Sequence, residues 1–186
     1  PIGDSPPALI ALGATLELRK GADARTLPLD AFFVDYGKQD RKPGEIVTGL
    51  YVPRLDPNHA FRCFKISKRF DQDITAVLMA VRLTLVDGSI TEARVAYGGM
   101  APTPKRAAGT EFALVGARPD TPSTWAAALR ALAEDFSPIS DMRASEDYRQ
   151  EVARALLAKA LVEIGGTPDE RTRITGARRE ETSHAA

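Results

Sequence analysis

The sequence has almost none of the residues that build metal centres and covalent cross-links. A single cysteine, Cys63, and two widely separated histidines, His59 and His184, occur among its 186 residues. One cysteine excludes an internal disulfide and a cysteine-built metal site. So few histidines supply no Ser/His/Asp or Cys/His constellation, and we expect neither metal ligands nor catalytic residues in this chain. Such sparing use of cysteine is typical of a reducing cytoplasm.

An excess of charge and a long hydrophobic run are missing as well. The 25 Lys and Arg residues balance the 25 Asp and Glu residues, which leaves no bias toward nucleic acid or an anionic membrane. No apolar stretch approaches the roughly 20 residues of a membrane span. The first residues carry neither an initiator methionine nor signal-peptide character. We therefore interpret the chain as a fragment of a globular protein, with no nucleic acid and no membrane as partner.

The first third of the chain predicts one short helix and several strands. Residues 8–12 form an apolar helical segment that follows two prolines and ends at Gly13. Residues 32–45 are a polar loop that is unusually rich in aromatic residues. Extended segments are indicated at 14–19, 25–33 and 45–53.

The middle of the chain predicts an antiparallel sheet of at least three strands. These strands are expected at 61–69, 74–86 and 89–99. The dipeptide Asp87-Gly88 is a strong type I′ turn signal and predicts a hairpin between the second and third strands. Alternation in the third strand predicts that Glu92 and Arg94 face water.

Two amphipathic helices are expected to pack on this sheet, so the fold class is α+β. The first covers 122–136 and the second begins after Ser145 as N-cap and stops at Gly165. The predicted buried face of the first helix consists of Trp125, Leu129, Leu132 and Phe136. That of the second consists of Tyr148, Val152, Leu156 and Ile164.

The first predicted strand of the sheet carries a cation on each of its faces. Alternation places Lys65 with Phe61 and Cys63 on one face. The other face holds Arg62 and Phe64. A lysine among apolar neighbours either extends its ammonium to the edge of the strand or needs a polar partner.

Three segments in this order resemble consecutive blocks of the FAD subunits of molybdenum hydroxylases, most closely the bacterial xanthine dehydrogenase branch. They are PIGDSPPALIALGATLELR, CFKISKRFDQDI with YGGMAPTPKRA, and FSPISDMRASEDYRQEVARALL. The resemblance implies that residues 1–58 end a vanillyl-alcohol-oxidase-type FAD-binding lobe. Residues 59–165 would form a CO-dehydrogenase-flavoprotein-type C-terminal α+β domain, and 166–186 a disordered tail.

By this resemblance, four residues contact FAD. Asp4 accepts hydrogen bonds from the ribityl or adenosine side, and Ile2 lines the same turn. Val47 packs on the flavin. Lys65 places its cation near the isoalloxazine ring, which would favour the electron-rich reduced flavin and explain a cation on that face of the strand. From the residues alone, Asp4 is equally a turn or helix-cap aspartate, and Val47 an ordinary core valine.

The resemblance also implies a side that faces NAD. Tyr36 lies by the nicotinamide-binding side, where an aromatic ring can hold the acceptor by stacking. Asp71 belongs to the loop that follows the flavin lysine, and Gly98 and Gly99 permit a close backbone approach. The alternatives are a hydrophobic surface clamp for Tyr36, a solvated charged turn for Asp71, and a plain turn or bulge for the glycines.

The resemblance implies a role in xanthine dehydrogenase. The purine would be hydroxylated at a molybdopterin centre on a separate large subunit, and electrons would pass through [2Fe-2S] clusters to FAD and then to NAD. The clusters and the first FAD lobe would lie in the N-terminal remainder of the same subunit. Two alternatives stay open: a carbon monoxide dehydrogenase or aldehyde oxidase type of FAD subunit, or, in isolation, a non-catalytic subunit-docking domain.

Overall fold

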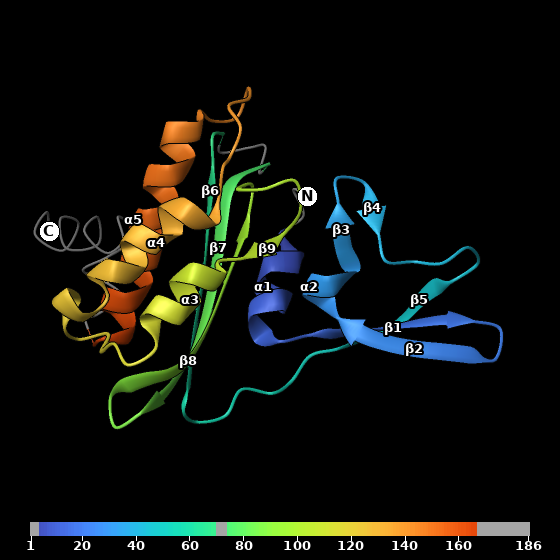
Figure 1. The fold of residues 1–186 in the computed structure, drawn as a ribbon, viewed down its shortest axis with the longest axis horizontal. Coiled ribbons are helices and arrows are strands. Elements are labelled where there is room, and N and C mark those ends of the chain that lie inside the picture. Colours follow the sequence, from blue (N-terminus) through green and yellow to red (C-terminus); the bar gives the residue numbers. More distant parts are fainter. Residues whose placement is uncertain (1–3, 70–73, 167–186) are drawn as a thin grey trace, which may run out of the picture.

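A four-stranded antiparallel sheet forms the centre of the fold. The computed structural model describes residues 4–69 and 74–166. In this sheet the strand order is β6-β7-β8-β9, and Figure 1 shows helices on both of its faces. The strands are β6 (His59–Ser67), β7 (Thr75–Val86), β8 (Ser89–Gly98) and β9 (Lys105–Arg106).

The predicted hairpin between β7 and β8 is confirmed. Asp87 and Gly88 connect the two strands with φ angles of 51° and 76°. A type I′ turn requires a positive φ at both central residues, which Asp tolerates and Gly adopts freely. The turn therefore sets the register in which Val81 lies opposite Val95 and Ala80 opposite Ala96.

Three helices cover one face of the sheet: α3 (Ala108–Leu114), α4 (Ala126–Asp135), which follows the 3₁₀ turn η1 (Pro122–Thr124), and α5 (Glu146–Ile164). The side chains at the centre of this interface are fully buried. They include Val77, Met79, Val81 and Leu83 of β7 and Leu114, Leu132, Leu157 and Leu161 of the helices. The buried face predicted for the first helix is confirmed at Trp125, Leu132 and Phe136.

Helix α3 was not predicted, because its N-terminus is held from a distance. The Asp135 carboxylate, at the end of α4, accepts hydrogen bonds from the backbone N–H groups of Gly109 and Thr110, both at 2.8 Å. It also accepts the hydroxyl of Thr110 at 2.7 Å. A cap supplied by a residue about 25 positions away leaves no signal in the local sequence.

The start of α5 is as predicted, but its buried face is rotated. The Ser145 hydroxyl accepts the backbone N–H of Tyr148 at 3.2 Å, which confirms the N-cap. Tyr148 itself is 45% exposed, whereas the neighbouring Arg149 is 3% exposed. The buried stripe then continues through Ala153, Leu156, Leu157, Ala160 and Leu161. The prediction put Tyr148 in the buried face, but the stripe begins one residue later, at the buried Arg149.

Helix α1 (Ser5–Leu12) covers the opposite face of the sheet. It ends at Gly13 with a φ of 81°, as predicted for a left-handed helix stop. Beneath α1 the sheet presents Ala80 and Ala96, which lie directly opposite each other and are fully buried. Small side chains at this cross-strand pair let the helix approach the sheet closely.

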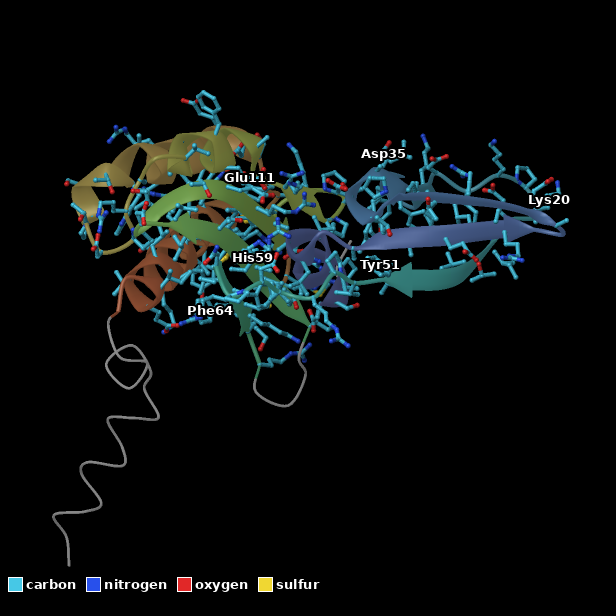
Figure 2. The ribbon with its side chains drawn as sticks, turned by 90° about the horizontal axis from the view of Figure 1, so that it is seen from below. Lys20, Asp35, Tyr51, His59, Phe64 and Glu111 are labelled. Carbon is cyan, nitrogen blue, oxygen red and sulfur yellow. The ribbon has the colours of Figure 1, made fainter. Side chains whose placement is uncertain are left out.

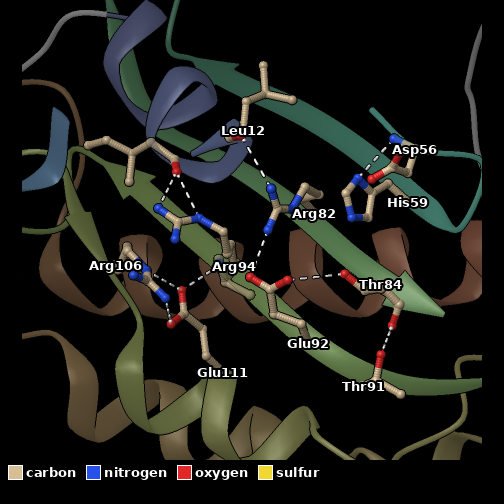
Figure 3. A network of polar contacts seen from close by, with 12 residues as sticks. Leu12, Asp56, His59, Arg82, Thr84, Thr91, Glu92, Arg94, Arg106 and Glu111 are labelled. Atoms are coloured by element: carbon tan, nitrogen blue, oxygen red, sulfur yellow. Dashed lines mark hydrogen bonds and ion pairs between the residues drawn. The ribbon is translucent and has the colours of Figure 1, made fainter. Parts of the chain in front are cut away.

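The expectation that Arg94 faces water is wrong, because α1 lies over it. The Arg94 guanidinium donates two hydrogen bonds to the carbonyl of Ile10, at 2.9 and 3.2 Å. Next to it, Arg82 donates to the carbonyl of Leu12 at 3.3 Å and to Glu92 at 2.7 Å (Figure 3). The last carbonyls of α1 thus receive hydrogen bonds from two cations of the sheet.

The remaining N-terminal elements form a sheet that projects from the helices and the four-stranded sheet, with the strand order β2-β1-β5. In Figure 2, Lys20 lies at its far end and Phe64 on the central sheet. Its strands are β1 (Thr15–Lys20), β2 (Asp23–Pro28) and β5 (Ile46–Tyr51). Helix α2 (Leu29–Phe32) and the hairpin of β3 (Phe33–Asp35) and β4 (Lys38–Gln39) lie between β2 and β5 in the chain.

Two of the N-terminal predictions need correction. The segment expected to be extended at 25–33 turns into helix α2 after Pro28. The segment expected to be a loop at 32–45 contains the β3–β4 hairpin, and Arg25 fixes its end by ion pairs with Asp40 at 3.0 Å and Glu45 at 2.8 Å. These tertiary contacts determine a conformation that short-range propensity leaves open.

We expect Arg94→Leu to lower the free energy of unfolding by about 1–3 kcal/mol, because the variant leaves the end of α1 without its strongest hydrogen-bond donor. Chemical denaturation measures the change. The control is Arg130→Leu, which alters an exposed arginine of α4 and should leave stability nearly unchanged. Equal stability of the two variants would show that the hydrogen bonds from Arg94 do not help to hold α1.

Candidate functional site

Asp4, immediately before α1, is tied to the central sheet through its side chain. Its Oδ2 atom accepts a hydrogen bond from Lys65 Nζ at 2.5 Å, and its Oδ1 atom accepts the Thr75 hydroxyl. Lys65 comes from β6 and Thr75 is the first residue of β7. Asp4 occupies the N-cap position of α1, but among the described residues its carboxylate makes no capping hydrogen bond to the helix.

This carboxylate is held in its charged form and is open to one side. Partial burial raises the pKa of Asp4, but the hydrogen bonds from Lys65 and Thr75 outweigh it and lower that pKa below the ordinary aspartate value. The Asp4 side chain is 42% exposed and that of Lys65 is 26% exposed. An ionised carboxylate with free surface can accept further hydrogen bonds from a ligand.

The cations on the two faces of β6 have separate partners. Lys65 pairs with Asp4 on the face covered by α1. On the face covered by α5, Arg62 Nε lies 3.1 Å from Glu163 Oε2, and that carboxylate is fully buried. Lys159 also reaches Glu163, at 2.8 Å. Because helices cover both faces of the sheet, each cation is matched by a carboxylate from the segment that covers it.

Val47 lies on β5, in the three-stranded sheet, and is 48% exposed. The interpretation of Val47 as an ordinary core valine is therefore wrong, and its side chain has free surface for a ligand. Two other residues implied in ligand binding, Ile2 and Asp71, lie outside the described residues.

A pocket of about 420 Å³ brings together segments that are far apart in the chain. Tyr36, in the turn between β3 and β4, lines it with Gly99, which follows β8. Gly98 is the last residue of β8 and lies opposite Leu78 of β7. The apolar part of the lining includes Met100, Ala101, Pro102, Pro138 and Ile139, and the charged part consists of Asp141, Arg143 and Arg149.

The size and lining of this pocket suit a small organic ligand. An exposed aromatic ring stands at its edge, since Tyr36 is 72% exposed. The Asp141 carboxylate faces two guanidiniums, with Arg143 at 3.1 Å and Arg149 at 2.7 Å. Burial raises the pKa of Asp141, but the backbone N–H groups of Arg143 and Ala144 and the Arg149 guanidinium lower it below the ordinary value.

Two residues of these sites were missed in the sequence. Thr75 carries a hydroxyl group and is buried at the start of β7. Arg149 is a charged residue at the first position of the buried stripe of α5. The signal for each was a polar side chain at a position where the apolar pattern demands burial. Asp141 and Arg143 also line the pocket, although no role in ligand binding was expected for them.

Comparison with known proteins identifies both parts of the chain. Residues 62–164 match the CO dehydrogenase flavoprotein C-terminal domain, and residues 1–55 match the FAD-binding domain in molybdopterin dehydrogenase. The chain belongs to the flavoproteins of the molybdenum hydroxylases.

Relatives of this molybdenum hydroxylase flavoprotein include a hydroxylase and a subunit of a dehydrogenase. A nicotinate hydroxylase of Emericella nidulans is 33% identical over 86% of this chain and 12% of its own length. A putative xanthine dehydrogenase FAD-binding subunit of Escherichia coli strain K12 is 29% identical over 88% of this chain and 57% of its own length. The chain thus spans little more than half of the bacterial subunit.

A solved structure confirms the fold of this flavoprotein. A chain of the carbon monoxide dehydrogenase of Hydrogenophaga pseudoflava superposes with a TM-score of 0.78 at 28% identity, over 86% of this chain and 55% of the other. The expected combination of an FAD-binding part and an α+β C-terminal domain is therefore confirmed.

The described residues, 4–69 and 74–166, contain no candidate metal site. Among them, no group of three or more His, Cys, Asp or Glu side chains could hold a metal ion. Within the same residues, no helix is both long and apolar enough to cross a membrane.

We expect Lys65→Met to raise the pH at which the flavoprotein unfolds in acid. The folded-state pKa of Asp4 lies below its unfolded value, so ionised Asp4 stabilises the fold above the unfolded pKa, and this is lost as the pH falls through the folded pKa. Without the Lys65 ammonium that folded pKa rises, and the loss begins at higher pH. Fluorescence of the single tryptophan, Trp125, reports the transition.

Lys38→Met is the matched control for this change. This variant removes the same charge as Lys65→Met, but from a side chain that is 73% exposed. Its acid midpoint should remain near that of the unmodified chain, and an equal shift in both variants would assign the effect to net charge instead of the Asp4 pair.

Proposed function

We propose that this chain forms one wall of an FAD site and, next to it, the pocket for the electron acceptor. The observation that carries the proposal is the Asp4–Lys65–Thr75 group, which fixes an ionised, partly exposed carboxylate at the start of α1. Its residues fall within the two segments that match FAD-binding and flavoprotein domains.

The residues fit the chemistry of FAD. The ribityl chain of FAD is rich in hydroxyl groups, and Asp4 is an ionised acceptor with free surface for them. Lys65 keeps a cation beside this acceptor, and Val47 offers an exposed apolar side chain. Bound FAD would supply two-electron redox chemistry, while the protein supplies binding, orientation and electrostatics.

The acceptor pocket is assigned to the space of about 420 Å³ between Tyr36 and Gly99. Tyr36 offers a ring on which the nicotinamide of NAD can stack, and Gly99 and the adjoining Gly98 allow the backbone to approach the ligand. Arg143 offers a guanidinium for the anionic part of a dinucleotide.

In the whole enzyme, we assign the chain to the FAD subunit of a cytoplasmic xanthine dehydrogenase. There, electrons from purine hydroxylation would reach NAD through [2Fe-2S] clusters and FAD. The partners would be the remainder of the same subunit and the large molybdopterin subunit. Residues 1–58 would complete the FAD-binding domain, and residues 59–165 would form the domain that follows it. The putative xanthine dehydrogenase FAD-binding subunit of Escherichia coli strain K12 among the relatives supports this choice.

A second candidate is the FAD subunit of a carbon monoxide dehydrogenase or aldehyde oxidase type of enzyme. The observation in its favour is the similarity of the fold to the carbon monoxide dehydrogenase of Hydrogenophaga pseudoflava.

A third candidate is a subunit-docking role for the isolated chain. Exposed apolar residues of β5, such as Ile46 and Tyr51, would suit it.

We expect Lys65→Met to weaken FAD binding about tenfold, because the variant removes one charge-assisted contact and leaves Asp4 less firmly held. Visible absorption after desalting, and the Kd for added FAD, measure this in the chain alone and in the enzyme complex that contains it. Lys38→Met should retain the flavin bands. Equal FAD affinity of both variants in both preparations would contradict the flavin wall and favour the docking role.

We expect Tyr36→Ala to raise the KM for NAD about tenfold in the enzyme complex and to leave turnover with an artificial dye acceptor unchanged, because only the stacking surface for nicotinamide is lost. Steady-state kinetics with the two acceptors measure the difference. Phe112→Ala removes an aromatic ring that is 86% exposed on α3 and serves as control. An unchanged KM in Tyr36→Ala would place the acceptor elsewhere.

A further inference from the structure

Arg149 connects three segments of the chain, two of which line the proposed acceptor pocket. Its side chain, on the first turn of α5, is 3% exposed. The Nη1 atom donates to the carbonyl of Ala76 at 2.5 Å and to the carbonyl of Gly99 at 2.7 Å. The Nη2 atom donates to Asp141 Oδ1 at 2.7 Å. One guanidinium therefore joins the start of β7, the end of β8 and the loop before α5.

Gly99 is shaped to receive this guanidinium. Its φ angle of +80° lies in the left-handed region that favours glycine. A Cβ atom at Gly99 would lie 2.3 Å from the carbonyl oxygen of Ala76 and 3.0 Å from Arg149 Nη1. The absence of a side chain thus lets the two carbonyls converge on Arg149.

Asp141 carries the effect of Arg149 into the opposite wall of the pocket. Its Oδ1 atom accepts the backbone N–H of Arg143 at 2.8 Å and that of Ala144 at 3.2 Å. Its backbone N–H donates to the carbonyl of Ala144 at 3.0 Å. The loop at 141–144 is therefore folded around the carboxylate that Arg149 holds in place.

Burying Arg149 is costly, which indicates that its bonds serve more than packing. Its charge has one carboxylate partner in this network, and Nε finds no hydrogen-bond partner within the described residues. A helix position facing an apolar core is ordinarily filled by an apolar residue at less cost. The planar fork of arginine is the feature that an apolar residue or a lysine could not supply, because it addresses several acceptors at fixed angles.

We propose that Arg149 is the positioning residue of the acceptor pocket. It sets the distance between the Gly99 wall and the 141–144 loop and so holds the pocket ready for a nicotinamide dinucleotide. Arg149 acts on the ligand through Gly99 and Asp141. The inference rests on the proposed function, because it concerns the pocket assigned there to NAD.

Arg149→Lys in the enzyme complex that contains this chain tests the proposal. Lysine keeps the charge but cannot bridge Ala76, Gly99 and Asp141 together. We expect amide hydrogen exchange at 99–101 and 139–144 to become about tenfold faster, because the two walls lose their common anchor. The KM for NAD should rise about tenfold, while flavin content and turnover with a dye acceptor stay unchanged.

Two further variants keep the proposal falsifiable. Asp141→Asn retains the side-chain carbonyl but loses the charge, and should change exchange and KM in the same direction by a smaller factor. Arg154→Lys alters an exposed arginine of the same helix and should match the unmodified enzyme.

The outcomes separate this inference from the function on which it rests. Unchanged exchange at 99–101 and 139–144 in Arg149→Lys overturns the positioning role. The positioning role is also overturned if Arg149→Lys leaves the KM for NAD unchanged while Tyr36→Ala raises it. Faster exchange together with an unchanged KM in both Arg149→Lys and Tyr36→Ala would keep Arg149 as the residue that orders the pocket and would reject NAD as its ligand.

Discussion

Two arginines lie directly opposite each other on the central strands, and the position of α1 depends on how their charges are satisfied. Arg82 and Arg94 are register partners, and like charges in that relation destabilise a sheet. The last carbonyls of α1, at Ile10 and Leu12, accept hydrogen bonds from both guanidiniums. Burial lowers the pKa of Arg94, as does the nearby Arg106, yet an arginine stays charged in proteins. Displacing α1 would therefore leave these two neighbouring cations without their carbonyl acceptors, with Glu92 as the remaining partner of Arg82.

The same sheet fixes both ends of α1 and leaves it little freedom between them. At the far end, Asp4 is held by Lys65 and Thr75. Between the ends, the helix lies on the alanine pair of Ala80 and Ala96, which permits close approach but supplies little apolar area. The opposite face of the sheet carries the large side chains and the main core. Polar contacts at its ends therefore determine where α1 sits, and with it where the Asp4 carboxylate is presented.

The sequence predicts local features well and long-range ones poorly. The hairpin at Asp87-Gly88 and the cap at Ser145 were predictable, because each depends on residues next to one another in the chain. The start of α3 depends on Asp135, and the cover over Arg94 depends on α1, so neither could be read from local alternation. Family resemblance put Tyr36 and Gly99 on one ligand-binding side, but it did not indicate that Asp141, Arg143 and Arg149 line the same pocket. Sequence periodicity also assumes that charged residues face water, and buried arginines with several backbone acceptors break that assumption.

The start of β7 is where the two proposed sites meet. Thr75 donates its hydroxyl to Asp4 on the α1 side, and the next residue, Ala76, accepts Arg149 through its carbonyl. Adjacent residues of one strand thus hold a flavin-side carboxylate and the anchor of the acceptor pocket. A displacement of this strand end would move both groups together, because each contact is a directed hydrogen bond. In the proposed function, the distance between a flavin at Asp4 and an acceptor beside Gly99 would be set by this single dipeptide, whereas two separately hinged walls would leave that distance free to vary.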